Sequence, residues 1–366
     1  VGQTTIGNPN LSWEKAKITN IGFNSILSNG LGIDFEYFIR ETNDILFDIP
    51  INVLTGFTSQ TSNAASMENK GWELGLRYNK TFGDLKVQLS GQLSKVENTV
   101  TDLNPKVDGG DLDRILYSSR ILGEGFPFLG FYVLKTDGLI TGSPDGPNAG
   151  MGAQAGDLNF IDSSRDGQIN LDDREYVGKD IPTYTYGFQL GLQYKGFDLA
   201  AIFQGEADVQ YYGDFELWRP DAGGVVTWKK WITESVTNNP SGTFPRAGST
   251  TSSYRFVNDF FLYDRDYLRL KNLQIGYNIP TDSLPIDGLR LFFNATNLLT
   301  FTNLPLVDPE QRSGAATTAD PALGEQGWAD RRMDGLMDGQ TDGRMDGQTE
   351  GLTDGRTNGR MDGRTD

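Results

Sequence analysis

The residues best suited to chemistry lie in one acidic segment, residues 162–173. Read as a twelve-residue loop, the segment places oxygen-bearing side chains at positions 1, 3, 5, 9 and 12 and a glycine at position 6, as calcium loops do. Position 7 of such a loop contributes a backbone carbonyl. The expected ligands are therefore Asp162, Ser164, Asp166, Gln168, Asn170 and Asp173. The segment predicts a Ca²⁺ site that braces a loop, and Ca²⁺ is the one cofactor that the sequence suggests.

Three features of this segment leave a second interpretation open. Ser164 is a poor calcium ligand, Asp173 stands where a bidentate glutamate is usual, and no helix is expected on either side. The alternative is a solvated acidic turn held by Asx-type hydrogen bonds.

Other reactive chemistry is strongly restricted by composition. The chain has no cysteine and no histidine, which excludes cysteine nucleophiles, disulfides, Ser-His-Asp triads and zinc sites of the usual ligands. Asp259, Asp264 and Asp266 could be interpreted as glycosidase carboxylates, but clusters of aspartate in turns are commoner than active sites. We therefore expect no enzymatic activity.

Aromatic side chains in the long connections are the remaining candidates for binding. Trp218, Trp228 and Trp231 could stack on sugar rings, or could equally pack the loops together or contact a partner protein. The net charge of −17 and the pI of about 4.5 argue against nucleic acid as a partner.

The elements that carry these residues follow a period of two. Apolar and polar side chains alternate from residue 11 to about residue 305, which indicates β-strands. The clearest alternating stretches are residues 31–37, 72–79, 85–94, 188–194, 197–203 and 289–296. Gly83-Asp84 and Lys195-Gly196 lie between paired stretches and predict two hairpins.

The lengths of strands and connections distinguish two kinds of β-protein. Alternation alone also fits a soluble sandwich, but these strands reach about ten residues and carry aromatic residues near their ends, as membrane-spanning strands do. Long connections are expected over roughly residues 48–66, 98–125, 138–183 and 206–262. Short turns on one rim and long loops on the other indicate an all-β, antiparallel transmembrane β-barrel, of which we expect about nine or ten strands.

The two ends of the chain differ from its centre. Residues 333–366 repeat a four-residue unit rich in Asp and Gly without any aromatic residue, so we expect a disordered tail after a linker at 311–332. Residue 1 is not a methionine, and no signal-peptide pattern follows it, so we expect a segment of a longer chain. Residues 1–310 are then the partial barrel.

A series of short sequence motifs, taken in their order along the chain, resembles one known family. The motifs lie at residues 8–15, 19–23, 67–74, 125–132, 137–138, 156–170, 184–188, 194–198, 266–277 and 297–301. Examples are Met-Glu-Asn-Lys-Gly-Trp-Glu-Leu at 67–74 and Asp-Tyr-Leu-Arg-Leu-Lys-Asn-Leu-Gln-Ile-Gly-Tyr at 266–277. Together they resemble the SusC/RagA-type TonB-dependent receptors.

This resemblance implies a fold, a function and partners. Members of the family form plugged barrels of about 22 strands in the bacterial outer membrane. They import glycans or peptides with a SusD-like surface lipoprotein, using energy delivered by TonB. The resemblance implies that this chain is the C-terminal portion of such a barrel, in contact with outer-membrane lipid and with an oligosaccharide or peptide substrate. The TonB contact would lie in an N-terminal part that this sequence does not contain. The alternative is a non-transporting, calcium-braced, β-rich adhesin or binding protein.

Overall fold

The structure is a computed structural model that describes most of the chain up to residue 311. The described residues are 5–51, 53–57, 59–103, 106–107, 110–111, 114–213, 233, 235–237, 241–246, 257–281, 285–286, 288–305 and 307–311. The three candidate tryptophans, residues 312–332 of the expected linker and the whole expected tail lie outside these ranges.

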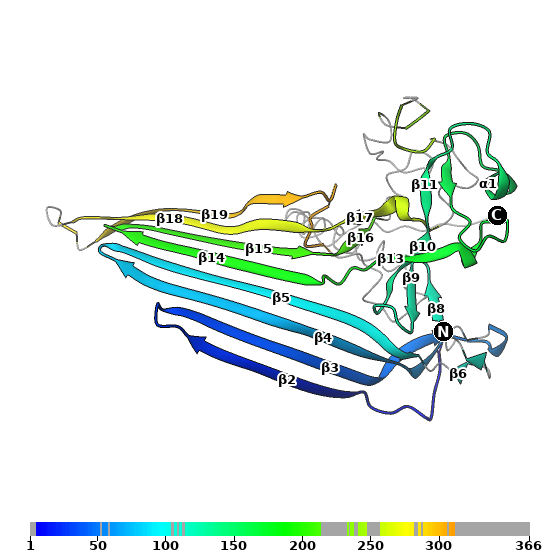
Figure 1. Cartoon of the computed structure of the whole chain (residues 1–366), viewed down its shortest axis with the longest axis horizontal. Helices are drawn as coiled ribbons and strands as arrows, with labels where there is room; N and C mark the ends of the chain where they lie inside the picture. Colours follow the sequence, from blue (N-terminus) through cyan, green and yellow to red (C-terminus); the bar gives the residue numbers. More distant parts are fainter. Residues whose placement is uncertain are drawn as a thin grey trace, which may run out of the picture. The chain divides into compact units, whose positions relative to one another are not determined.

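One nine-stranded sheet dominates the described residues, which confirms the expected fold class and strand number. Eight strands follow one path in the order β19-β18-β15-β14-β5-β4-β3-β2 (Figure 1). β1 pairs with β4 beside that path. Their bounds are β1 Thr5–Ile6, β2 Lys15–Ile26, β3 Leu31–Pro50, β4 Ser59–Phe82, β5 Leu85–Leu103, β14 Tyr184–Tyr194, β15 Phe197–Ala207, β18 Tyr267–Ile279 and β19 Leu289–Thr302. Neighbours along the path are antiparallel.

Two tight turns set the register at one rim of this sheet. β4 and β5 are joined by Gly83-Asp84, and β14 and β15 by Lys195-Gly196, as the sequence predicts. Lys195 and Gly196 have φ values of 45° and 88°. Positive φ at both central residues matches a type I′ turn, whose twist suits a two-residue hairpin.

The sheet has one apolar face and one polar face. In one cross-strand row, Leu192 of β14 lies between Val87 of β5 and Leu199 of β15. In the next row, Gly191 lies between Gln88 and Ala200. Because successive side chains point to opposite faces, these two rows lie on opposite sides of the sheet. We call them the outward face and the polar face.

The prediction of a long connection over residues 48–66 is wrong. Residues 48–66 are mostly strand, because β3 runs to Pro50 and β4 begins at Ser59. Phe47, Ile49, Ala64 and Ala65 are buried together with residues of the next connection, in a cluster completed by Val100, Leu103, Ile115, Leu122 and Leu129. This packing keeps the hairpin extended where the sequence alone indicates a loop.

The long connections form small sheets and short helices of their own. A four-stranded sheet contains β8 (Arg114–Tyr117), β9 (Arg120–Gly123), β10 (Gly130–Leu134) and β13 (Arg174–Gly178), and two-stranded sheets pair β6 with β7, β11 with β12 and β16 with β17. The shorter strands are β6 Lys106–Val107, β7 Gly110–Asp111, β11 Thr136–Leu139, β12 Leu158–Phe160, β16 Gln210–Tyr212 and β17 Leu262–Asp264. The helical pieces are η1 Val53–Thr55, α1 Gly146–Gly150, η2 Leu171–Asp173 and η4 Asp259–Phe261.

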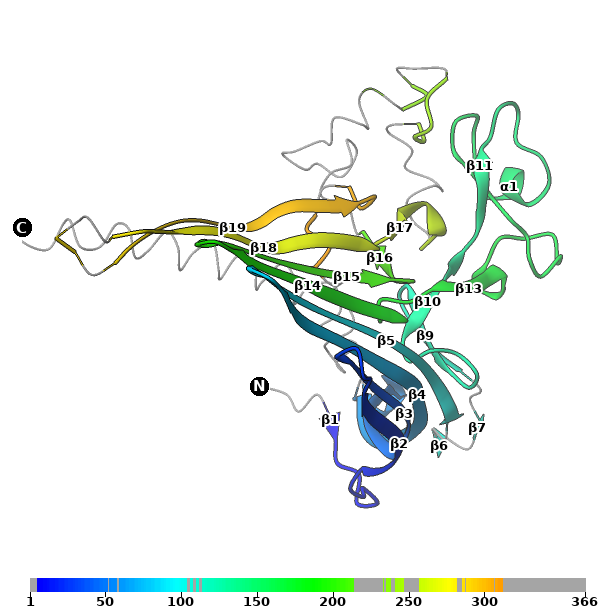
Figure 2. The same ribbon diagram turned by 60° about the vertical axis from the view of Figure 1, so that its left-hand side comes forward.

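These connections lie at the end of the main sheet opposite the two tight turns (Figure 2). Short turns at one end and structured loops at the other agree with the expected two-rim arrangement. Among the described residues, no helix is both long enough and apolar enough to span a membrane.

Candidate functional site

The polar face of the main sheet is rich in unpaired carboxamides. Gln88 of β5, Gln189 and Gln193 of β14, and Gln274 of β18 line one hollow close to the tight turns. Their side-chain amides make no hydrogen bond to any other described residue, although each carries both donors and an acceptor. This part of the face therefore offers hydrogen bonds to whatever lies against it.

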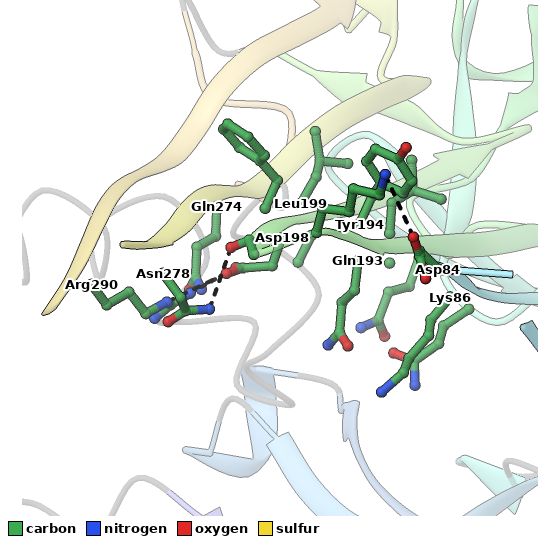
Figure 3. Close-up of a pocket in the computed structure, with 17 residues that line it drawn as sticks. Asp84, Lys86, Gln193, Tyr194, Asp198, Leu199, Gln274, Asn278 and Arg290 are labelled. Carbon is green, nitrogen blue, oxygen red and sulfur yellow. Dashed lines mark hydrogen bonds and ion pairs between the residues drawn. The ribbon is translucent and has the colours of Figure 1, made fainter. Parts of the chain in front are cut away.

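The hollow has a volume of about 540 Å³. Its walls come from five strands, β5, β14, β15, β18 and β19, and from the two tight turns, and Figure 3 shows the side chains that line it. The space exists partly because Gly191 and Ala200 carry small or no side chains in the row that contains Gln88. A polar hollow of this size is within the range of small-ligand sites.

Four of the five charged groups at the hollow are paired with one another, and Lys86 has no ion pair with any described residue. Arg290 Nη2 lies 2.7 Å from Asp198 Oδ2, and Lys195 Nζ lies 3.6 Å from Asp84 Oδ2. The first pair crosses over Gly276, where an added Cβ would lie 2.5 Å from Asp198 Oδ1 and 2.6 Å from Arg290 Nη2. A side chain at position 276 would push this pair aside, and the hydrogen-bonding capacity left over belongs to Lys86 and to neutral amides.

The acidic segment at 162–173 folds as a compact loop. Asp162 accepts hydrogen bonds from the backbone N–H groups of Asp166 and Gly167, at 3.2 and 2.9 Å. Asp166 accepts from Gln168 N at 2.8 Å and from Asn170 Nδ2 at 3.0 Å. Gly167 has φ of 85°, so the sharp turn requires the glycine at this position.

Asp173 closes the loop from its buried end. Its carboxylate accepts from Ser164 N at 3.0 Å and from Asn170 N at 2.8 Å. Burial by itself would raise the pKa of Asp173, but the hydrogen bonds from Ser164 and Asn170 outweigh it and lower the pKa below 3.8. The carboxylate is therefore charged at neutral pH and stabilises the loop.

The loop does not bring three acidic side chains into one cluster. Within the described part of the chain, no group of three or more His, Cys, Asp or Glu residues is arranged to hold a metal ion. The oxygen donors have the chemistry that Ca²⁺ prefers, but in this conformation backbone amides occupy them. Both interpretations of the segment, a calcium loop and an Asx-turn loop, remain compatible with this geometry.

The other candidates have different outcomes. Asp259 accepts from Thr136 N and Oγ1 at 3.1 and 2.7 Å, and Asp266 accepts from Val209 N at 3.3 Å, so both carboxylates hold local backbone. Trp218, Trp228 and Trp231 lie outside the described residues, and their role stays a prediction.

Buried arginines are the feature that sequence reasoning missed. Arg120, Arg265 and Arg269 have at most 4% of their surface exposed. Arg120 donates to Asp180 Oδ2 at 2.9 Å and lies over the Phe131 ring. The available signal was weak, since Arg269 fits the local alternation of apolar and polar residues from Leu268 to Lys271.

A sheet of long antiparallel strands, with one apolar face, one hydrogen-bonding face, tight turns at one end and long connections at the other, is typical of membrane-spanning β-proteins. Residues 1–298 match the family model described as TonB dependent receptor-like, beta-barrel. The chain therefore belongs to the TonB-dependent receptor β-barrel family, which is a family of outer-membrane receptors and not of enzymes.

Named relatives agree with this assignment. TonB-dependent receptors P26 and P3 of Formosa agariphila are each 31% identical, over 330 and 323 residues, which cover 83% and 84% of this chain. A solved structure of the RagAB peptide transporter superimposes with a TM-score of 0.70 at 26% identity and covers 86% of this chain. The chain spans about a third of the length of these relatives, 32% of each receptor and 34% of the transporter chain.

Proposed function

We propose that this chain is part of the wall of an outer-membrane importer that takes up peptides or oligosaccharides. The observation that carries the proposal is the polar face, whose unpaired amides face the interior if the apolar outward face meets lipid. Amides bind peptide groups and sugar hydroxyls equally well, because both are neutral donors and acceptors. The likeness to the RagAB peptide transporter supports this interpretation.

The proposal includes two protein partners. A SusD-like surface lipoprotein would cover the rim that carries the long connections, as the RagAB likeness suggests. TonB would supply energy through a part of the receptor outside this chain. Trp218, Trp228 and Trp231 would contact substrate or the lipoprotein from the connection between β16 and β17.

Uptake by cells tests the proposal. A deletion strain complemented with the full-length receptor should take up a fluorescent peptide or oligosaccharide mixture, and a strain without TonB should not. A control strain would express the receptor with residues 184–207 deleted, which removes the central hairpin β14–β15. If the intact receptor reaches the outer membrane and no labelled solute accumulates above the level of the deletion strain, the importer function is wrong and the adhesin alternative is favoured.

We also propose that the 162–173 loop binds Ca²⁺ and is thereby braced. Support comes from the donor set and from the turn at Gly167, which has the backbone conformation that position 6 of a calcium loop needs. The side chains of Asp162, Ser164, Asp166, Asn170 and Asp173 and the carbonyl of Gln168 would hold the ion after the present Asx-type hydrogen bonds rearrange.

A further inference from the structure

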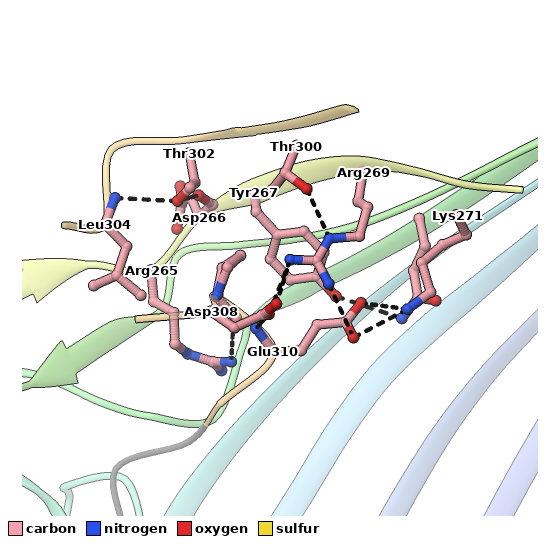
Figure 4. Close-up of polar contacts among 12 residues, drawn as sticks. Arg265, Asp266, Tyr267, Arg269, Lys271, Thr300, Thr302, Leu304, Asp308 and Glu310 are labelled. Carbon is pink, nitrogen blue, oxygen red and sulfur yellow. Dashed lines mark hydrogen bonds and ion pairs between the residues drawn. The ribbon is translucent and has the colours of Figure 1, made fainter. Parts of the chain in front are cut away.

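The chain after β19 turns back across the polar face of β18. Residues 303–305 and 307–311 follow the end of β19, and Figure 4 shows Asp308 and Glu310 directed toward the side chains of Arg269 and Lys271. Leu304 is 6% exposed, so this segment packs against the wall instead of projecting into solvent.

A β-bulge in β18 makes this contact possible. The register shifts between Leu270 and Asn272 against β19, and a matching shift occurs against β15. Below the bulge the odd-numbered residues Leu273 and Ile275 lie on the outward face. Above it, Arg269 pairs with Gln204 and lies on the polar face. Bulges are known to re-aim single side chains in this way.

Arg269 is the centre of the contact. Its Nη2 lies 2.9 Å from both Oδ atoms of Asp308, its Nη1 lies 3.3 Å from Glu310 Oε2, and its Nε donates to Thr300 Oγ1 at 2.9 Å. Lys271, the bulged residue, lies 2.7 Å from Glu310 Oε1. All three guanidinium nitrogens are thus engaged, which fixes the segment in one orientation.

Arg265 fastens the segment at a second point and connects it to two other parts of the wall. Its Nη1 donates to the carbonyl of Pro309 at 2.8 Å, and its Nη2 donates to the carbonyl of Asp180 at 3.3 Å. Nη2 also lies 3.0 Å from Glu206 Oε2, an ion pair that lacks hydrogen-bond geometry. Arg265 is 1% exposed, so loss of these partners would leave a buried charge.

We infer that Arg265 and Arg269 are positioning residues that hold residues 303–305 and 307–311 on the polar face, so that this segment forms part of the surface that a passing substrate meets. The role in substrate passage rests on the proposed importer function, whereas the fastening itself does not. Burial tends to raise the pKa of Asp308, but the Glu310 N–H and Arg269 hold it below 3.8. The ion pair of Asp308 with Arg269 is therefore present at neutral pH and is lost only as the pH falls through the lowered pKa.

Thiol labelling tests the fastening directly. The chain has no cysteine, so a Leu304→Cys variant introduces one buried thiol into this segment. In outer-membrane preparations of the full-length receptor, this thiol should react slowly with a maleimide. Adding Arg269→Ala should accelerate labelling at least about tenfold, because reactivity follows the population of locally opened states. The receptor without the introduced cysteine provides the blank.

Two further variants separate positioning from general damage. The charge swap Arg269→Asp with Asp308→Arg should restore slow labelling, which a purely structural loss would not allow. Arg77→Ala breaks a matched ion pair with Asp34 elsewhere on the polar face and should leave labelling slow. If Arg269→Ala fails to assemble, the Asp308→Ala/Glu310→Ala variant removes the same contacts from the segment side.

The fastening of the segment and its contact with substrate can be contradicted separately. Equal labelling with and without Arg269, or no rescue by the swap, overturns the fastening whether or not the receptor imports anything. Faster labelling with an unchanged half-saturating substrate concentration for uptake overturns the contact with substrate. A shift of at least about threefold in that concentration, with outer-membrane levels unchanged, supports it.

Discussion

Single residues in the acidic loop have two separable roles. Asp173 is buried and accepts two backbone hydrogen bonds, so its carboxylate contributes to the loop without any ion. Asp166 is exposed and Asp162 is half-buried, and both also accept backbone hydrogen bonds, but water can replace those bonds when the side chains turn toward a cation. Asp162 and Asp166 are therefore the carboxylates whose replacement a calcium test should detect.

At this scale we predict that the double variant Asp162→Asn/Asp166→Asn abolishes Ca²⁺ binding. Calorimetric titration of the purified receptor should give a dissociation constant on the order of 10⁻⁴–10⁻³ M, the range of extracellular calcium modules. The matched control is Asp172→Asn, an exposed carboxylate in the same loop that is not an expected ligand. Absence of heat at millimolar Ca²⁺, or equal weakening by the control, would contradict the site.

Each strand of the main sheet contributes to two environments. In β14, Leu190 lies between Leu89 and Ala201 on the outward face, while the preceding Gln189 lies between Ser90 and Ile202 on the polar face. The strand has eleven residues, which is close to the length that spans a bilayer. Both residues lie near its middle, so they differ mainly in the face they occupy.

The opposite faces of Leu190 and Gln189 give a prediction for strand β14. Leu190→Arg should lower the unfolding free energy in lipid vesicles by about 2–4 kcal/mol, the cost of an arginine facing lipid near the bilayer midplane. Gln189→Arg, the same change one residue earlier, should cost much less because the polar face is hydrated. Urea unfolding followed by tryptophan fluorescence measures both, and equal losses would mean that the faces are assigned wrongly.

On the scale of the whole molecule, the sheet has two open edges. Among the described residues, β2 pairs along its length only with β3, and β19 only with β18. Unpaired backbone groups at such edges are costly in lipid, where no water can satisfy them. The strands also differ in length, since β4 has 24 residues and β14 has eleven. The longer strands carry the packed connections beyond the spanning region.

We therefore predict that the 366-residue chain expressed by itself does not assemble into a heat-resistant membrane barrel. Expressed within the full-length receptor, the same residues should migrate faster on gels before boiling than after it, as folded barrels do. Outer-membrane fractionation with and without boiling measures the difference. Heat-modifiable migration of the isolated chain would show that its edges are closed by another route, such as self-association.

Much of the fold could be predicted from local pattern. Alternation, the two-residue turns and the sequence motifs identify the strands, their two faces and the family, because each of these signals lies within a short stretch. The extent of the strands could not be predicted, since the polar residues of 59–66 resemble a loop until Phe47 and Ile49 pack beside them. Of the candidate sites, only the compact turn of the acidic loop at residues 162–173 could be predicted, from the spacing of its oxygen-bearing side chains around Gly167.

What the sequence determined by itself is which residues share the apolar face and which share the polar face of each regular strand, since a period of two is a local property of the chain. Only the tertiary structure decided which strands are neighbours and which charges meet. β5 pairs with β14 across about 80 intervening residues, and Arg269 meets Asp308 only because a bulge turns it to the polar face. Register and ion pairing depend on atoms distant in sequence, so no local pattern carries them.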